Sequence, residues 1–475
     1  MSTWTLLSYV AGWTIRIVML FIVPRKRDVA SASAWLLLIL LEPRIGLFLY
    51  LLVGRHPLSR RLIRRHAEVM ARLTEKGRPL AEQTAAFHPD LKGPLVQTVR
   101  LAERLSEMPT TGGNSVELLA ESREFIDRLV ADIDAAQQHV HLVSYIYADD
   151  ETGRRVTDAL IRAVERGVVC RVLVDSVGSR RLMRRRAEGM RAAGIDVREV
   201  LRVGSLRRYA ARIDLRYHRK LVVIDGRIGY SGSQNIVDPD YGTKDLVWHD
   251  LMVRLKGPIV LELLAVFIGD WYFTTDEFLA LCDLAPDPVG TGAVAAHILP
   301  SGPDYPTQNY QRLVVGAIHD AQERVTMTTP YFVPDAPFLQ AMETAVLQGV
   351  EVRLIVPRRS NHPVVDAASR AYYQDLLDAG VKLYLNDEGL LHSKTMSIDG
   401  EMAFIGSSNF DIRSFTLDFE INLLFYDSTV AAQLDEQQRR YIAQSTLLTA
   451  EEWRHTSSRA ARVVRTAAKL FSPLL

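Results

Sequence analysis

The chain has 475 residues, of which 48% are hydrophobic and 24% are charged, and its formal net charge is +1. This length allows two or three domains, each with a substantial core, and excludes a single small module. Only two cysteines occur, Cys170 and Cys282, which excludes a disulfide framework and a cysteine metal site.

Two apolar segments lie near the N-terminus, at residues 4–23 and 34–53. Each has roughly the 20 residues that a helix needs to cross a bilayer. Nothing basic precedes the first segment, so we expect a retained anchor of two hydrophobic helices over residues 1–57 and no cleaved signal peptide. A hairpin that enters only one leaflet is an alternative, because polar residues and a proline interrupt both segments. The interrupting residues are Arg16, Glu42, Pro43 and Arg44.

Basic residues flank the second apolar segment on both sides, and the larger group follows it. The positive-inside rule therefore predicts a multi-pass anchor with the bulk of the chain on the cytoplasmic side. The flanking residues are Arg25, Lys26 and Arg27 before the segment, and Arg55, Arg60, Arg61, Arg64 and Arg65 after it.

Beyond the anchor the chain repeats its own pattern of elements. Residues 137–147, QQHVHLVSYIY, align with residues 322–332, QERVTMTTPYF, and both read as buried strands. A helical pattern, a second strand and a further helix follow each of them. This alternation predicts an α/β fold of two half-domains, with mixed, mostly parallel sheets flanked by helices.

The repeat suggests where the parts of the chain begin and end. The stretch that begins APDPVGTG has the composition of a linker between the halves. We expect the two halves, residues 115–475, to fold when the anchor is removed. The expected parts are the anchor at 1–57, a charged helical connector at 58–114, the first half at 115–284, the linker at 285–293 and the second half at 294–475.

Basic residues greatly outnumber acidic ones between Arg180 and Lys220. Such a stretch is either a solvated arginine-rich surface or a surface that faces anionic phosphate. A membrane anchor on the same chain favours an anionic lipid over a nucleic acid as the partner.

One motif occurs once in each half. The first copy is HRKLVVID at 218–225 and the second is HSKTMSID at 392–399, so both read HxKxxxxD. The residues that follow also match, with DGRIGYSGSQN in one half and DGEMAFIGSSN in the other. Two copies of so long a pattern indicate a functional site, whereas one copy alone would be weak evidence.

The Asp-Gly pair in each copy predicts a hairpin with a two-residue turn. This register sets Ile224 opposite Arg227, His218 opposite Ser233, and His392 opposite Ser407. Histidine, lysine, serine and asparagine then share one face of each hairpin, where they would form a phosphate site. The expected phosphate-binding residues are Ser233, Asn235, Ser407 and Asn409. Asp225 and Asp399 fall in the turns, and we expect them to have a structural role.

The twin motifs resemble the HKD signature of the phospholipase D superfamily, in which each half supplies one histidine to a shared site. With the two apolar segments, nearly the whole chain is similar to the bacterial cardiolipin synthases. The resemblance implies an enzyme of the bacterial inner membrane that acts on anionic phospholipids. It extends to LPSGP at 299–303, TTPYFVPD at 328–335, WHDLMVRLKGP at 248–258 and SNFDIRSFTLDFEINL at 408–423.

The resemblance also implies a mechanism. One imidazole attacks phosphorus to give a phosphohistidine, and the other protonates the departing alcohol and deprotonates the incoming one. By resemblance we choose His218 as the nucleophile, and Asp250 and Glu420 as the carboxylates that orient the histidines. No metal or other cofactor is expected. The catalytic set that the signature implies is His218, Lys220, Asp225, His392, Lys394 and Asp399.

The function we expect is synthesis of cardiolipin from two phosphatidylglycerol molecules with release of glycerol. A hydrolytic phospholipase D would use the same residues with water as the acceptor, and a nuclease of the superfamily is disfavoured by the anchor. The sequence leaves the acceptor open among phosphatidylglycerol, phosphatidylethanolamine and glycerol. It also leaves the oligomeric state open, with a homodimer as one option.

Overall fold

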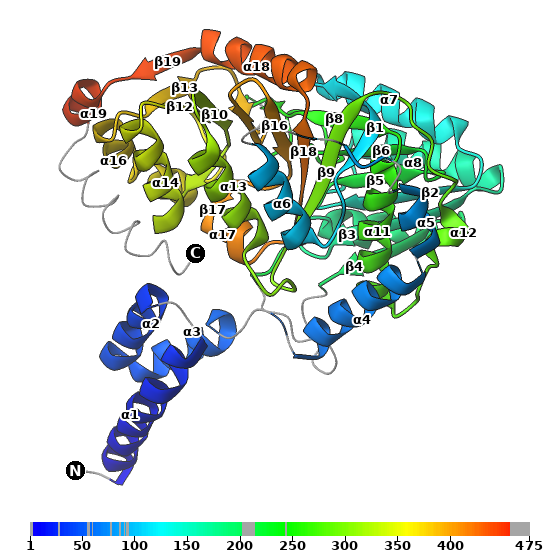
Figure 1. Ribbon diagram of the computed structural model, residues 1–475. Helices are drawn as coiled ribbons and strands as arrows, with labels where there is room; N and C mark the ends of the chain where they lie inside the picture. Colours follow the sequence, from blue (N-terminus) through cyan, green and yellow to red (C-terminus); the bar gives the residue numbers. More distant parts are fainter. Residues whose placement is uncertain are drawn as a thin grey trace.

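The computed structural model describes residues 3–26, 29–54, 58, 60–76, 78–84, 87–89, 91, 95–201, 214–242 and 245–456 (Figure 1). It contains a small group of N-terminal helices that extends from a large α/β core.

The N-terminal helices are α1 (Thr3–Ile22), the 3-10 turn η1 (Val23–Lys26), α2 (Val29–Leu41) and α3 (Pro43–Val53). Within the described residues, α1 alone is long and apolar enough to cross a membrane. The second expected membrane helix is broken into segments of 13 and 11 residues. Pro43 explains the break, because it has no amide hydrogen for the helical hydrogen bond. The expectation of two membrane-spanning helices therefore receives support for only the first.

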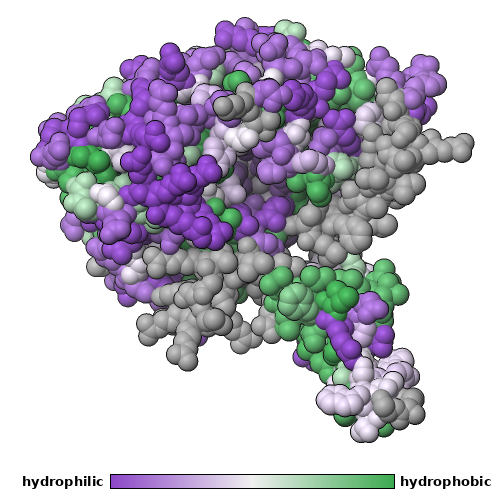
Figure 2. Space-filling model, turned by 180° about the vertical axis from the view of Figure 1, so that it is seen from behind, coloured by the Kyte–Doolittle hydropathy of each residue, from purple (hydrophilic) through white to green (hydrophobic). Residues whose placement is uncertain are grey.

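Polar contacts cross this anchor. The guanidinium of Arg16 in α1 donates to the carbonyl oxygen of Leu40 at 2.9 Å, close to the end of α2. Arg44 in α3 donates back to Ser8 in α1. Figure 2 shows apolar side chains over much of the outside of these helices, as expected for a surface that contacts lipid. The flanking Arg27 and Arg55 lie outside the described residues.

The connector is built into the core. Its helices are α4 (Arg60–Lys76), α5 (Arg78–Thr84) and α6 (Leu95–Ser106). Leu62, Val69 and Leu73 of α4 are buried in the large cluster that includes α11 (Ile259–Thr275). Val99 and Ala102 of α6 are buried in the core of the second half. Strand β1 (Thr111–Leu119) also begins before residue 115, where we expected the first half to start.

This packing gives a prediction about truncation. Removal of residues 1–57 should leave a cooperatively folded core. Removal of residues 1–114 should not, which revises the expectation that residues 115–475 fold alone, because α4 and α6 are part of the core. The second deletion removes Leu58, Leu62, Val69, Leu73 and Val99, all buried. At about 2 kcal/mol for each side chain the loss is on the order of 10 kcal/mol, comparable to the whole stability of a domain. Thermal unfolding followed by circular dichroism would test it, and equal unfolding temperatures for the two deletions would contradict it.

A single mixed sheet of fifteen strands runs through both halves. The strand order β8–β6–β5–β2–β3–β4 in the first half matches β18–β16–β15–β10–β12–β13 in the second. Among the described strands of this sheet, the parallel pairs are those of β2–β3–β4 and β10–β12–β13. The sheet is therefore mixed as expected, but most of its pairs are antiparallel, whereas we expected mostly parallel ones. Strands β1 and β9 pair with each other and join the halves.

The first half contributes to this sheet β1, β2 (His139–Ser144), β3 (Val169–Asp175), β4 (Asp196–Val200), β5 (Leu221–Ile224), β6 (Ile228–Gly232) and β8 (Met252–Lys256). The second contributes β9 (Val294–Ser301), β10 (Arg324–Thr328), β12 (Glu351–Pro357), β13 (Lys382–Asn386), β15 (Thr395–Ile398), β16 (Met402–Gly406), β18 (Glu420–Tyr426) and β19 (Ser445–Leu448). The short strands β7 (Trp248–His249) and β14 (Leu390–Leu391) pair with each other, as do β11 (Phe332–Val333) and β17 (Phe410–Asp411).

Helices cover the faces of this sheet (Figure 1). In the first half they include α7 (Ser122–Ala135), α8 (Glu151–Glu165), α9 (Arg180–Arg185), α10 (Ala187–Ala192), α11 and α12 (Leu281–Leu284). In the second they are α13 (Asn309–Asp320), α14 (Ala336–Leu347), α15 (Pro363–Arg370), α16 (Tyr373–Asp378), α17 (Ile412–Thr416), α18 (Ser428–Ala443) and α19 (Ala450–Thr456).

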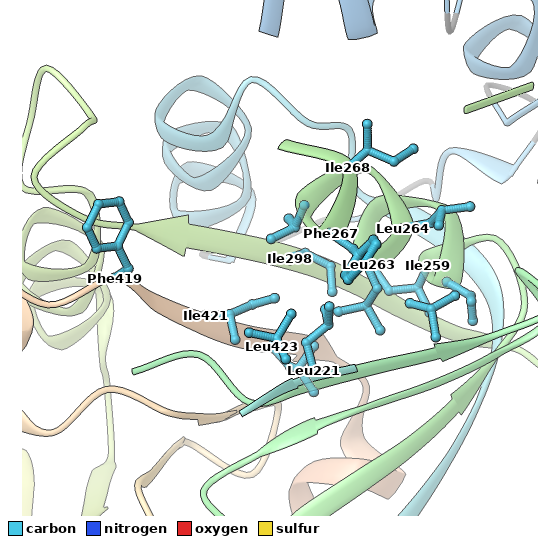
Figure 3. Packing of buried hydrophobic residues seen from close by; sticks show 14 of the residues in the cluster. Leu221, Ile259, Leu263, Leu264, Phe267, Ile268, Ile298, Phe419, Ile421 and Leu423 are labelled. Atoms are coloured by element: carbon cyan, nitrogen blue, oxygen red, sulfur yellow. The ribbon is translucent and has the colours of Figure 1, made fainter. Parts of the chain in front are cut away.

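The two halves share one hydrophobic core. Helix α11 lies across the strands where the halves meet, and its buried face contacts side chains from both (Figure 3). Leu221 comes from β5 of the first half, and Ile298, Ile421 and Leu423 come from β9 and β18 of the second. Since about 25 cal/mol is gained for each Å² of apolar surface buried, this shared cluster fixes the halves against each other.

Candidate active site

Each motif ends in the tight turn that its Asp-Gly pair predicts. Asp225 and Gly226 have φ angles of 51° and 60°, and the amide of Arg227 donates to the carbonyl of Ile224 at 3.0 Å. Asp399 and Gly400, with φ of 53° and 69°, repeat this arrangement. Both central residues of such a turn need positive φ, which asparagine, aspartate and glycine tolerate best.

The two aspartates bind backbone amides of the neighbouring strands. The carboxylate of Asp225 accepts from the amides of residues 137–139 at 2.8 to 2.9 Å. The carboxylate of Asp399 accepts from those of residues 322–324 at 2.7 to 2.8 Å. These contacts fit the structural role that we expected for the two aspartates from their position in the turns. They fit less well with a catalytic role, which the family signature implied.

The strand register differs from the expected one by one residue. Ile224 pairs with Ile228 and Ile398 pairs with Met402, so Arg227 and Glu401 are extra residues after each turn. A shift by one residue moves every following side chain to the other face of the strand. The predicted pairs His218–Ser233 and His392–Ser407 are therefore wrong.

Each histidine is held by a carboxylate from the opposite half. The Nδ1 atom of His218 lies 3.0 Å from both oxygens of Glu420, and Nδ1 of His392 lies 2.6 Å from Oδ1 of Asp250. Glu420 and Asp250 were both expected to orient histidines, and here each orients the histidine of the other repeat. A carboxylate on Nδ1 fixes the tautomer and leaves Nε2 free for chemistry.

Backbone pairing between the halves brings each carboxylate to the histidine of the other half. Tyr217 forms an isolated parallel bridge with Phe419, and the amide of His218 donates to the carbonyl of Phe419 at 2.9 Å. In the second copy β14 (Leu390–Leu391) pairs with β7 (Trp248–His249), and the amide of His392 donates to His249 at 2.8 Å. Each histidine therefore enters the site beside the residue that precedes the other half's carboxylate.

The two serines bind these carboxylates. The hydroxyl of Ser233 donates to Asp250 at 2.6 Å, and that of Ser407 donates to Glu420 at 2.5 Å. Both serines are fully buried, and each hydroxyl also accepts a backbone amide. Both hydroxyls are therefore engaged with the carboxylates that hold the histidines. Their role toward phosphate remains a prediction.

The two asparagines are also buried at the site. The side-chain oxygen of Asn235 accepts the amide of Ile146 at 3.1 Å, which leaves its amino group as the available donor. The side-chain oxygen of Asn409 has no hydrogen-bond partner within the described residues. Their role toward phosphate remains a prediction.

Lys220 and Lys394 lie beside the histidines. Each Nζ donates to the carbonyl of the histidine two residues earlier, at 2.7 Å for Lys220. Burial lowers the pKa of Lys220 to about 8, although Glu420 and Asp250 oppose the shift. Burial likewise lowers the pKa of Lys394 to about 7, with Asp250 opposing. Two cations held in a buried site provide a place for an anionic group.

The two histidine–carboxylate pairs differ electrostatically. Burial raises the pKa of Glu420 to about 7, although Lys220 and Ser407 oppose this shift. Burial also disfavours charge on Asp250, but His392 outweighs this effect and holds the pKa of Asp250 below its usual range. Burial lowers the pKa of His218 well below its usual value, and Lys220 adds to the effect.

Three contacts at the site were missed from the sequence. Tyr145 lies against His218 with ring centroids 4.9 Å apart, and Trp248 lies against His392 at 4.5 Å. Ser414 donates to Glu420 at 2.9 Å. When the two halves are aligned, the position equivalent to Tyr145 is Pro330. The position equivalent to Trp248 is Asp418. Comparison of the repeats could not find the aromatic residues, because they are not repeated.

The basic stretch is partly described. Within it Arg186 pairs with Asp149, and α9 is rich in arginine. The arginines at 202, 207, 208 and 212 lie outside the described residues. Its predicted role toward anionic lipid remains a prediction.

Comparison with known proteins finds a matching family in both halves of the chain. Residues 129–271 and 314–442 match the family described as "Cardiolipin synthase, PLD-like domain". Cardiolipin synthase A of Proteus mirabilis is 36% identical, over 98% of this chain and 96% of that protein. Cardiolipin synthase A of Yersinia pseudotuberculosis is 37% identical, with the same coverage of both chains. Among solved structures, phosphatidylserine synthase of Haemophilus influenzae matches with a TM-score of 0.61 and 16% identity, over 80% of this chain and 100% of that chain.

Proposed function

Because the chain belongs to the cardiolipin synthase family of phospholipase D-like enzymes, we propose that it joins two phosphatidylglycerol molecules into cardiolipin and releases glycerol. The observation that carries the proposal is the pair of exchanged contacts, His218 with Glu420 and His392 with Asp250. They make one site from two halves, with two histidines and two lysines. Such a site suits a two-step transfer of a phosphatidyl group.

In the first step, Nε2 of His218 attacks the phosphorus of the donor lipid. The bond from phosphorus to the glycerol oxygen breaks, and His392 gives its proton to that oxygen. Glu420 holds the Nδ1–H of His218 and balances the positive charge that develops on the ring. Lys220 and Lys394 neutralise the phosphate oxygens, where negative charge grows in the transition state.

In the second step, the terminal hydroxyl of a second phosphatidylglycerol replaces glycerol. His392 removes its proton as the oxygen attacks phosphorus, and the phosphorus–nitrogen bond to His218 breaks. The products are cardiolipin and free His218, so each catalytic group returns to its starting state.

The choice of His218 as nucleophile rests on resemblance. Burial lowers the pKa of both histidines, that of His392 to about 3, so both rings are neutral at neutral pH and the pKa values do not separate their roles. The bound phosphodiester carries negative charge beside His392, which favours the protonated form that the leaving group requires.

Burial of the reacting groups favours transfer to an alcohol over hydrolysis. His392 is 4% exposed and Glu420 is fully buried, so little free water reaches them. Purified enzyme in phosphatidylglycerol vesicles should release cardiolipin and glycerol in equal amounts. Phosphatidic acid as the main product would instead support a hydrolytic phospholipase D.

We also propose that the enzyme works at the cytoplasmic face of a bacterial inner membrane. Helix α17 directly precedes β18 and Glu420, and it lies on the edge of the core from which the anchor extends (Figure 1). A site on this edge could receive lipid from the bilayer. Nucleic acid is not expected as a substrate.

The pH dependence of kcat/KM should reflect the ionisation of Glu420 and of the two lysines. Glu420, with a pKa of about 7, accepts the Nδ1–H of His218 best when ionised, so kcat/KM should rise with pH through about 7. Lys394, with a pKa of about 7, and Lys220, with a pKa of about 8, lose their charge as pH rises, so kcat/KM should fall above about 7 and leave a narrow peak. Rates in mixed micelles would show this peak, and Glu420→Gln should abolish its rising side. A rising side unchanged in that variant would contradict the assignment.

A further inference from the structure

The residue between His218 and Lys220 differs between the two motifs. The first copy has Arg219 and the second has Ser393 at the same place. Arg219 is 2% exposed, so its guanidinium is a buried cation at the seam of the two halves. A buried guanidinium is costly unless its donors are paired, which makes the identity of its partners informative.

The guanidinium of Arg219 binds the second half at the origin of β18. Its Nε donates to the carbonyl oxygen of Glu420 at 3.0 Å, and its Nη2 reaches the carbonyl of Ser301 at 3.4 Å. Glu420 and Ser301 are paired residues of β18 and β9. One side chain of the first half therefore holds the backbone of Glu420 and that of its strand partner Ser301.

Asp270 holds Arg219 in this position. It lies on α11, pairs with Nη1 of Arg219 and is 5% exposed. The hydroxyl of Tyr217 also contacts Nη1 at 3.3 Å, and the ring of Phe419 lies 5.8 Å from the guanidinium carbon. These contacts fix the orientation of the planar guanidinium. A lysine could not make the same set of contacts, because its ammonium group lacks this planar arrangement of donors.

We propose that Arg219, held by Asp270, is a positioning residue that sets Glu420 in line with Nδ1 of His218. The proposal rests on the proposed role of His218 in the transfer. Glu420 contacts the nucleophile, whereas Arg219 acts only through the backbone of Glu420. A displacement of that backbone by about 1 Å would turn the imidazole away from phosphorus, and errors of this size cost about 100-fold in rate.

The test must separate positioning from stability. An apolar replacement of a buried ion pair is often neutral for stability, so we choose the double variant Arg219→Met with Asp270→Leu. The matched control is Arg254→Met with Asp132→Leu. That pair joins β8 to α7 in the same half at 2.7 Å, and its side chains are also largely buried. Among the described residues, the control pair contacts Tyr230 and Glu117, and it contacts neither Glu420 nor His218.

We expect the Arg219 double variant to unfold near the temperature of the control while its kcat falls about 100-fold. Its KM for phosphatidylglycerol in mixed micelles should change less than about 3-fold, because substrate contacts are unaltered. A kcat within about 3-fold of the control enzyme would overturn the positioning role. If the double variant does not fold, Arg219→Lys keeps the charge but lacks the fork, and it should lower kcat about 10-fold. A wild-type kcat in Arg219→Lys would equally overturn the role.

His218→Ala, assayed in parallel, distinguishes the two proposals. A His218→Ala enzyme that still transfers at the normal rate would overturn the proposed function and the positioning role with it. An inactive His218→Ala enzyme beside a fully active Arg219 double variant would overturn the positioning role alone.

Discussion

Replacement of either His218 or His392 with alanine is expected to abolish phosphatidyl transfer. One imidazole forms the bond to phosphorus and the other moves the proton, and both operations occur in every turnover. Each single variant should lose at least about 1,000-fold in kcat, because general acid–base catalysis alone contributes roughly 10²- to 10⁴-fold. The double variant should be no worse than the singles, since residues that act as a unit are not additive. Cardiolipin formation from labelled phosphatidylglycerol measures all three.

The control for these variants is His319→Ala, which changes an exposed histidine in the last turn of α13. It should transfer at the normal rate and unfold at the normal temperature. Near-normal turnover in either His218→Ala or His392→Ala would mean that the two motifs do not form one site.

The second expected result concerns which histidine attacks. In His392→Ala the nucleophile His218 is intact, but the leaving group receives no proton. A donor whose leaving group needs no proton, such as a nitrophenyl phosphodiester, should therefore still react once. We expect a slow burst of about one nitrophenol for each enzyme, together with a trapped phosphoenzyme. His218→Ala should give neither.

Mass spectrometry of the trapped enzyme should place the phosphoryl group on His218. A group found on His392 would reverse the two roles and leave the reaction class unchanged. The matched variants Glu420→Gln and Asp250→Asn extend the test. Glu420→Gln should slow the burst, because Glu420 contacts the attacking ring, while Asp250→Asn should slow turnover with little effect on the burst.

Self-similarity in the sequence predicted the fold class and brought together the motif residues, but it could not give the contacts between the halves. The Asp-Gly turns were visible, whereas the extra residues Arg227 and Glu401 carry no local signal, so the register was one residue off. Asp250 and Glu420 follow their motifs at comparable places. This spacing does not indicate that each carboxylate binds the histidine of the other half. That contact depends on backbone pairing between segments that are distant in the sequence.

The second apolar segment and the connector show what average composition hides. Hydropathy counts apolar residues, so residues 34–53 read as one helix, although α2 ends before Pro43 and α3 begins there. Charge predicted a charged helical connector over residues 58–114 and gave no sign that its helices pack into the core. In α4 the charged residues surround a narrow apolar stripe formed by Leu62, Val69 and Leu73, which is buried against the core. An amphipathic helix of this kind is recognised by its periodicity and is hidden in average composition.

The exchanged carboxylates also bear on how such a chain could have arisen. One half on its own carries a histidine and an acid, yet His218 and Asp250 belong to different pairs and cannot complete each other. An ancestral chain with a single motif would therefore have been active only as a symmetric pair, with each copy supplying the acid for the other's histidine. Duplication and fusion of the gene would place the two copies in one chain, where they no longer need to be identical. The fused copies were then free to differ, with glutamate in one pair, aspartate in the other, and an arginine beside only one histidine.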